Sequence, residues 1–519
     1  IFVGHIEKGT PVLCYYISRP KPIAQRKVFP MIKSIQQFEE SGIKKLEKII
    51  ESFMKNPKDM ASFVYGIRDE VIALGLDLIK ETLEDCNQML RDSVKRKQSW
   101  EVVRTDEKKL TTCLGTVCFE KTLFRNKQTR ESAYLLDRII GIESHERLTE
   151  DAEAKLLEEA VQTSYRKAGE ETSLTDEVSK QTVKNKLHKL TFPQQKEEQP
   201  KKKAVEFLYI DADEDHVSLQ FKEKKGDLET GENNWKNNCV LAKLVYVYEG
   251  IEPESPKSKR HKLVNPHYFS GVYDGADNAE LWDEVYAYLD SHYDLKKVKK
   301  IYLNADGGTW IQSGKKRIAG ITSVLDEFHL QKYLLKMTSH LKDSADDARK
   351  EICDAVKSGT KADFQSVVGQ LKVCAETEAT EKRIEESGAY ILSNWTAAKI
   401  RLKDRETVKG CSAEGHVSHV LSSRMSSRPM GWSRTGVDKM AHLRAYYWNG
   451  GDMLELVRQQ ERELPVAAGT ENEVLSCESM LRWERHRHNK LGKYIESINH
   501  SVSTEVKKYA WFHAHIWGL

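Results

Sequence analysis

The stretch that decides the fold is VEFLYIDAD, residues 205–213, a run of apolar and aromatic residues that ends in acid. Such a run is typical of a buried β-strand. HVSLQF (216–221) follows almost at once and alternates in polarity, so we expect it to be the antiparallel hairpin partner of the first strand. After a polar loop, LAKLVYVYEG (241–250) predicts a third strand.

The residues that follow predict a mixed α/β sheet. An apolar stripe over 280–293 indicates a helix, KKIYLNADG (299–307) a fourth strand, ITSVLDEF (321–328) a fifth, and 329–341 another helix. A three-stranded meander followed by helix, strand and strand–helix describes an RNase H-like core with a mixed five-stranded sheet. In that topology the first and fourth strands are neighbours at the centre of the sheet.

Two of these strands end in aspartate: Asp211 and Asp213 on the first, and Asp306 on the fourth. Because the two strands are neighbours, we expect the carboxylates to converge and to raise one another's pKa unless a divalent cation lies between them. Oxygen ligands favour Mg²⁺ or Mn²⁺, and two such ions can promote phosphoryl transfer. Aspartates also terminate strands in ordinary turns, but two such ends on adjacent strands favour the metal site.

A third acid, Glu414, lies in GCSAEGHVSHVLSSRMSSRPMGWS (410–433), a segment rich in small and functional side chains. If residues 413–425 are helical, Glu414 lies at the N-terminal end of that helix and faces the sheet. The predicted metal ligands are therefore Asp213, Asp306 and Glu414. The same segment offers side chains for phosphate contacts and for stacking on bases, namely Arg424, Arg428, Arg434 and Trp432.

The nine cysteines are odd in number and have no framework spacing, which favours a reducing cytoplasm over an oxidising compartment. Cys411, His416 and His419 offer an alternative zinc interpretation of the segment around Glu414, but no fourth ligand is evident. Cys113 and Cys118 are interpreted as half-buried thiols at a hairpin turn.

Upstream of the sheet, the pattern is mostly helical. Residues 1–30 are interpreted as a leader or read-through, 31–100 as a helical hairpin broken at Asn56-Pro57, and 101–147 as a β-hairpin region. Three further helices are expected between 149 and 190, the second over 165–171 and the third over 178–190.

The third of these helices, VSKQTVKNKLHKL, is basic. A short helix, a tight turn and a basic helix form the layout of a helix-turn-helix, whose second helix contacts DNA. The residues expected to face DNA are Lys180, Gln181, Lys184, Lys186 and His188. A charged surface helix in a small bundle would give the same pattern.

Composition limits the choice of class. Hydrophobic residues make up 39% of the 519 positions and charged residues 31%, and no stretch is apolar enough to span a membrane. The net charge of +3 gives no argument for a nucleic-acid partner, so that argument depends on local segments.

Taken together, these motifs resemble those of the ISLre-type transposases of bacterial insertion sequences, a group once catalogued as an uncharacterised protein family and related to the Mutator-like DDE transposases. The matching stretches are IDADEDHVSLQ (210–220), YLNADGGTWI (302–311), VLDEFHLQKYL (324–334) and the segment 410–433. The resemblance runs from about residue 31 to near the C-terminus.

The resemblance implies a catalytic triad of two aspartates and a glutamate at Asp213, Asp306 and Glu414, with Asp211 as the alternative first acid. Asp326 and His329 match a signature that supports the site in the related transposases. The implied division of the chain is a helix-turn-helix region (148–191), a linker (192–203), the first part of the core (204–329), an all-helical insertion (330–409), the glutamate-bearing part (410–445) and a C-terminal helical region (446–519).

The implied activity is binding of terminal inverted repeats, followed by cleavage and strand transfer of DNA with two Mg²⁺ or Mn²⁺ ions. The expected setting is the bacterial cytoplasm, with a homodimer or larger assembly on DNA and no membrane partner. Two alternatives remain open: a DNA-binding regulator without chemistry, which the intact acids argue against, and a metal-dependent nuclease that cuts without joining.

Overall fold

The structure is a computed structural model that describes residues 33–143, 145–193, 201–220, 238–404, 406–408, 413–428 and 430–460. The chain divides into two compact units. The first contains the described residues up to 109 together with 117–145, and the second contains 110–116 and 146–463. The region expected to be a helix-turn-helix therefore lies in the same unit as the sheet.

The first unit is a helical hairpin followed by a small sheet. Asn56 and Pro57 interrupt the helices as predicted, and the Asp59 carboxylate caps the long helix α3 by accepting a hydrogen bond from the Ser62 amide. Its elements are α1 (Lys33–Gln37), η1 (Phe38–Gly42), α2 (Ile43–Lys55), α3 (Met60–Asp92), α4 (Val94–Ser99), β1 (Trp100–Thr111), β2 (Thr116–Asn126), β3 (Ser132–Tyr134) and α5 (Leu135–Ile139). The strands follow the order β1-β2-β3.

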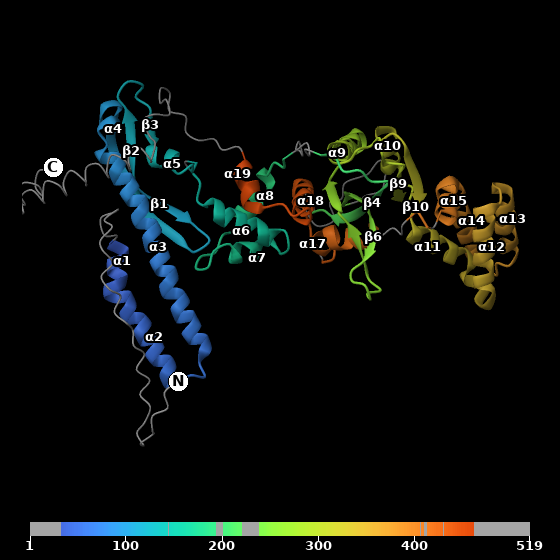
Figure 1. Cartoon of the computed structure of the whole chain (residues 1–519), viewed down its shortest axis with the longest axis horizontal. Helices are drawn as coiled ribbons and strands as arrows, with labels where there is room; N and C mark the ends of the chain where they lie inside the picture. The colour runs from blue at the N-terminus through green and yellow to red at the C-terminus, as the bar shows by residue number, and fades with distance from the viewer. Residues whose placement is uncertain are drawn as a thin grey trace, which may run out of the picture. The chain divides into compact units, whose positions relative to one another are not determined.

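The second unit is built on a mixed five-stranded sheet with the order β10-β9-β4-β5-β8. Figure 1 labels its strands β4, β9 and β10. Its strands are β4 (Phe207–Ser218), β5 (Cys239–Tyr248), β8 (His267–Gly271), β9 (Lys300–Ala305) and β10 (Ile321–Leu325). β5 pairs antiparallel with β4 and β8, whereas β9 pairs parallel with β4 and β10. The five-stranded sheet and the adjacency of the strands at 205–213 and 299–307 are confirmed.

The prediction of a hairpin partner at 216–221 is wrong. β4 continues as one strand through Asp213 to Ser218 and pairs along that whole length with β5. The antiparallel partner of β4 is β5, and the third strand of the meander is β8, which the sequence pattern did not predict. A small two-stranded sheet, β6 (Gly250–Pro253) and β7 (His261–Val264), lies outside the five-stranded one.

The side chains of β4 alternate between two packed layers. Leu208, Ile210 and Ala212 point into one apolar core, formed with α9 (Asn278–His292) and α10 (Thr309–Arg317). Tyr209 and Val217 point into the other, which is completed by α6 (Glu150–Ala160), α8 (Lys180–Lys189), α18 (Arg434–Trp448) and α19 (Met453–Gln459). Because residues two apart in a strand share a face, Asp211 and Asp213 lie on the side of this second core.

The remaining elements of the second unit are helical. The stretch expected to be an all-helical insertion contains α11 (Glu327–Thr338), η3 (Ser339–Ser344), α12 (Ala345–Ser358), α13 (Lys361–Val373), α14 (Glu378–Ser393) and α15 (Trp395–Lys403), and these helices share a core of their own. The others are α7 (Tyr165–Glu171), η2 (Gly275–Asp277), α16 (Ala413–Val417), η4 (Ser418–Ser422) and α17 (Ser423–Met425). Within the described ranges, no helix is both long and apolar enough to cross a membrane.

Candidate active site at the ends of β9 and β10

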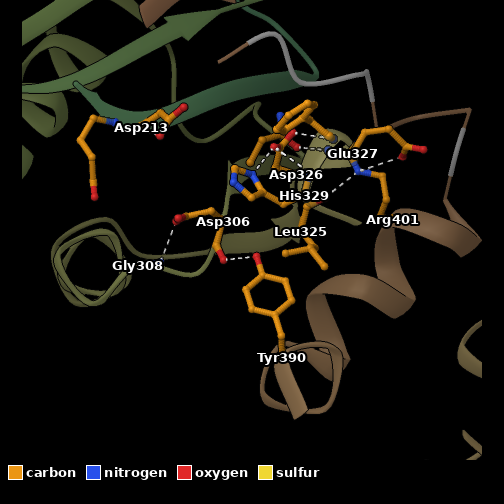
Figure 2. A network of polar contacts seen from close by, with 12 residues as sticks. Asp213, Asp306, Gly308, Leu325, Asp326, Glu327, His329, Tyr390 and Arg401 are labelled. Atoms are coloured by element: carbon orange, nitrogen blue, oxygen red, sulfur yellow. Dashed lines mark hydrogen bonds and ion pairs between the residues drawn. The ribbon is translucent and has the colours of Figure 1, made fainter. Parts of the chain in front are cut away.

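Asp213 and Asp306 lie on neighbouring strands of the sheet. The parallel pairing sets Asp211 opposite Asn304, so the same register carried two residues further brings Asp213 beside Asp306. Burial raises the pKa of Asp213 to about 7, and the negative charge of Asp306 contributes to that rise. Figure 2 shows the two side chains at one edge of the site. The sequence predicted that Asp213 lies at the end of a strand, and that prediction is wrong. Asp213 lies inside β4, level with the end of β9.

The main chain around Asp306 is held from two directions. Its carboxylate accepts a hydrogen bond of 2.8 Å from the Gly308 amide, and its carbonyl accepts one of 2.5 Å from the Tyr390 hydroxyl (Figure 2). Gly307 adopts a φ of +96°, and a Cβ there would lie 2.5 Å from Oδ1 of Asn394. This turn therefore requires glycine, and the helical insertion packs directly on it.

Asp211 is buried and its carboxylate is engaged within the fold. It accepts hydrogen bonds from the hydroxyls of Tyr246 (2.8 Å) and Tyr248 (3.2 Å) and from Nδ2 of Asn304 (2.6 Å). The buried Arg401 guanidinium donates in turn to Oδ1 of Asn304 at 2.6 Å. Asp211 therefore anchors the centre of the sheet, which leaves Asp213 as the acid that faces Asp306.

Asp326 and His329 form a pair at the start of α11. The Asp326 carboxylate caps the helix by accepting hydrogen bonds from the amides of Phe328 and His329, and it lies 2.7 Å from Nδ1 of His329. That hydrogen bond, with the negative charges of Asp326, Asp306 and Asp213, raises the pKa of His329. A protonated imidazole is thereby favoured close to the two facing aspartates.

Glu414 is exposed on α16, and it does not form a metal-binding group with the two aspartates. Among the residues that the structure describes, no group of three or more His, Cys, Asp or Glu side chains is arranged to hold a metal ion. The structure adds no support for the zinc interpretation of Cys411, His416 and His419. Nδ1 of His416 lies 3.0 Å from the Tyr268 hydroxyl, burial lowers the pKa of His416 to about 4, and Cys411 lies outside the described residues.

The chemistry of Asp213 and Asp306 fits a divalent cation. The two negative charges repel each other at a partly buried position. Either a proton or a cation removes this repulsion, and the raised pKa of Asp213 reflects the first of these. Their oxygens are ligands that suit Mg²⁺ or Mn²⁺. These two residues would hold the ion, and any further protein ligand would have to come from elsewhere.

Two residues expected to contact DNA are in fact part of the core. Arg424 is buried, donates to the Ala160 carbonyl at 2.9 Å and lies over the Trp432 ring, 4.9 Å from its centroid. Trp432 is also buried, and its Nε1 donates to the Met425 carbonyl. They hold the glutamate-bearing segment to α6 and are unavailable to DNA, whereas Arg428 is exposed.

The basic helix α8 has the same mixture of roles. Lys186 points inward and pairs with Glu146 at 2.9 Å and Glu153 at 2.7 Å. His188 is half-buried, and a Cβ on Gly436 of α18 would lie 3.2 Å from its Nε2. Lys180 and Gln181 are exposed and Lys184 is partly so, which makes these three the accessible polar residues of the predicted set.

Sequence reasoning missed the residues that support the site from the helical insertion. Tyr390 and Arg401 lie in helices α14 and α15, far from the aspartates in sequence, and contact the backbone of Asp306 and of Leu325. Asn394 packs against Gly307 between them. No spacing in the sequence marks these residues, since each lies in an ordinary charged helical pattern.

The sequence profile of an uncharacterised protein family, UPF0236, matches residues 54–463. A UPF0236 protein of Caldanaerobacter subterraneus subsp. tengcongensis, whose name gives eleven loci, is 36% identical over 413 residues, covering 80% of this chain and 83% of the relative. A second UPF0236 protein of the same organism is also 36% identical over 413 residues, covering 79% of this chain and 84% of the relative. The chain belongs to the UPF0236 family.

Proposed function

We propose that this UPF0236 protein is the DNA transposase of an insertion sequence, which cuts DNA at the element ends and joins the freed ends to target DNA. The observation that carries the proposal is the pair formed by Asp213 and Asp306 on adjacent parallel strands of a mixed five-stranded sheet. That sheet has the strand order and directions expected of an RNase H-like core. The many loci named for one relative also favour a mobile element.

In this proposal Asp213 and Asp306 hold Mg²⁺ or Mn²⁺, and two ions would be bound with Glu414 as a third ligand. When bound, the ions supply activation of a water or a 3′-hydroxyl and stabilisation of the leaving oxygen. The residues of the chain hold the ligands in place: Gly308 and Tyr390 fix Asp306. Glu414 is exposed on α16, and the proposal requires that it joins the two aspartates around the ions.

We infer that His329 supports the site rather than acting as the base. The hydrogen bond to Asp326 and the nearby carboxylates raise the pKa of His329. Held by Asp326, it lies close enough to Asp306 and Asp213 to respond to their charges. We infer that it orients the acidic site and favours an approaching phosphate.

DNA recognition is proposed for helices α7 and α8 as a helix-turn-helix. They pack on each other, and α8 is capped by the Ser179 hydroxyl, which accepts a hydrogen bond from the Thr182 amide. Exposed Lys180 and Gln181 stand in the first turn of α8, where residues of a recognition helix contact base edges. Lys186 is excluded from this role by its internal ion pairs.

The test is a cleavage assay on labelled element-end DNA with Mg²⁺ or Mn²⁺, comparing the wild-type chain with Asp306→Asn. The matched control is Asp347→Asn, which changes an exposed aspartate of α12. Metal-dependent nicking at the element end that Asp306→Asn abolishes, with DNA binding retained, supports the proposal. Specific binding without cleavage in any metal would contradict it and indicate a regulator.

A further inference from the structure

The contacts within the helical hairpin of the first unit fix how its two main helices lie side by side. Phe53 of α2 stacks on Phe63 of α3, with ring centroids 4.4 Å apart. Nζ of Lys45 lies 3.2 Å from the carboxylate of Glu70. The earlier residue of α2 meets the later residue of α3, so the helices run antiparallel, and Figure 1 shows α2 alongside the first half of α3. This register sets each residue of α2 level with a particular residue of α3.

Six exposed apolar side chains of this hairpin lie in pairs. The exposed fraction of each residue is between 43 and 71%. In the register above, three residues of α2 are level with three of α3: Ile43 with Val71, Ile50 with Val64, and Met54 with Met60. We call these six residues the apolar ladder. Exposed apolar residues are usually scattered singly, so three pairs in a row indicate an interaction surface.

The three pairs lie on the same side of the hairpin. Ile49 and Phe53 of α2 face α3, since Phe53 stacks on Phe63 and a Cβ on Gly66 would lie 3.1 Å from Ile49. An α-helix turns by about 100° per residue, so the exposed residues of each helix lie about a quarter turn from the facing ones, in the same rotational sense. Antiparallel helices turn in opposite senses when both are viewed from one end. The two exposed stripes therefore form a single apolar face.

The charge of the hairpin indicates the kind of partner. Residues 33–92 contain 12 acidic and nine basic side chains, whereas the whole chain has a net charge of +3. A negative surface repels the phosphates of nucleic acids and of anionic lipids. The partner that fits an apolar face on an acidic hairpin is therefore another protein surface.

The two edges of the apolar ladder carry opposite charges at the same level. Exposed Glu47 borders the ladder on α2, and exposed Arg68 borders it on α3. Glu47 lies two residues after Lys45, and Arg68 lies two residues before Glu70, so the ion pair between Lys45 and Glu70 sets them level. Arg68 pairs with its neighbour Asp69 at 2.7 Å, and 49% of its side chain remains exposed to a further partner.

A second copy of the hairpin is complementary to this face. A two-fold axis parallel to the helices exchanges the two edges and keeps every level, so it lays α2 of each copy over α3 of the other. Glu47 of each copy then meets Arg68 of the other copy. A two-fold axis across the helices would instead lay α2 on α2 and bring together the acidic edges that hold Glu47 and Glu51. Charge therefore selects the first arrangement.

We propose that the apolar ladder is the interface with a second copy of this chain, and that two hairpins form a four-helix bundle with α2 of each copy on α3 of the other. Each helix then lies antiparallel to its neighbours, as is usual in such bundles. α2 has 13 residues and is about 20 Å long. This is short for a permanent interface, so the dimer should be reversible. The interface requires no DNA, so the inference does not depend on the proposed function.

The first test measures the mass of the purified full-length chain, free of DNA, by sedimentation equilibrium over a wide range of protein concentration. We expect a reversible dimer for the wild type. Val71→Lys puts a charge into the ladder, whereas the control Ala73→Lys puts the same charge at an exposed position of α3 outside it. Because the interface contains Val71 twice, Val71→Lys should weaken dimerisation about a hundredfold. Ala73→Lys should dimerise like the wild type, and both variants should keep the helix content measured by circular dichroism.

The second test uses charge to identify the partner and its orientation. Glu47→Arg alone and Arg68→Glu alone each place two like-charged pairs in the interface, and each should weaken dimerisation by about tenfold. An equimolar mixture of the two variants should regain the wild-type affinity, because every pair then has opposite charges. A chain that carries both substitutions should regain it for the same reason.

Three results would overturn the proposal. The first is a wild-type chain that stays monomeric at every concentration, and the second is a dimer that Val71→Lys leaves unchanged. The third is a mixture of Glu47→Arg and Arg68→Glu chains that dimerises no better than either variant alone. Cleavage of element-end DNA is measured separately, so either proposal can fail while the other stands.

Discussion

Replacing Asp213 by asparagine should stabilise the metal-free protein at alkaline pH. Burial, with repulsion by Asp306, raises the pKa of Asp213 from its ordinary value of 3.8 to about 7. Each tenfold change in acidity is worth about 1.4 kcal/mol, so ionised Asp213 costs the folded state up to about 4 kcal/mol. Asparagine has nearly the same shape and no charge, and therefore removes this cost.

The pH dependence follows from the same raised pKa. Below about pH 4 the carboxyl is protonated in both the folded and the unfolded chain, and it costs nothing. As the pH rises from 4 through 7, the unfolded chain releases the proton first, so the folded state loses stability until Asp213 is ionised in both. The advantage of Asp213→Asn over wild type should thus be absent near pH 4 and largest above pH 7.

The assay is urea unfolding in EDTA at several pH values between 4 and 8, with the difference in free energy of unfolding between variant and wild type as the readout. Asp347→Asn is the control, since it changes an exposed aspartate and should give no pH-dependent difference. Adding Mg²⁺ at pH 8 should stabilise the wild type and leave Asp213→Asn unchanged. An Asp213→Asn protein that is equally or less stable than wild type at pH 8 would show that the buried charge of Asp213 does not destabilise the folded chain.

Four further substitutions test His329, helix α8 and Arg444 of α18. Asp326→Asn should lower the pKa of His329 toward its ordinary value, as measured by NMR titration of the imidazole, because the carboxylate hydrogen bond is the main cause of the rise; an unchanged pKa would contradict this cause. Lys186→Met should lower the free energy of unfolding in urea by about 3 kcal/mol, because two glutamates lose their cation. Lys180→Ala should weaken DNA binding and leave the stability unchanged. The reverse result would exchange the roles of the two lysines. Arg444→Met should cost roughly 3 kcal/mol by removing donors to the carbonyls of Val161, Val420 and His419, and a loss below 1 kcal/mol would show that water replaces them.

Much of the central sheet could be predicted from sequence because its strands are long apolar runs. The apolar residues within 205–213 and 299–307 favour burial, and the chain topology makes the two strands neighbours. The turn predicted before 216–221 was wrong because no glycine, proline or asparagine interrupts 213–216, and an alternating continuation of a strand looks like a new strand. β8 was missed because five residues give too short a pattern.

The candidate site was predictable at its two strands and not beyond them. The alternation of side chains along β4 does not by itself show that Asp211 is shielded from solvent. Tyr246 and Tyr248 cover it, and their position depends on the register between β4 and β5. Burial of Arg424 and Trp432 likewise depends on packing against α6. A basic or aromatic residue in a motif looks the same in the sequence whether it binds DNA or packs the motif against a neighbouring helix.

We propose that this chain joins DNA with Asp213, Asp306 and Glu414. The most direct test supplies element-end DNA that already carries a free 3′-hydroxyl, together with a target plasmid and Mg²⁺, and measures covalently joined product. We predict joined product for the wild type and for Asp347→Asn, and none for Asp213→Asn, Asp306→Asn or Glu414→Gln. Joining that persists in Asp306→Asn would show that this carboxylate is not needed for strand transfer.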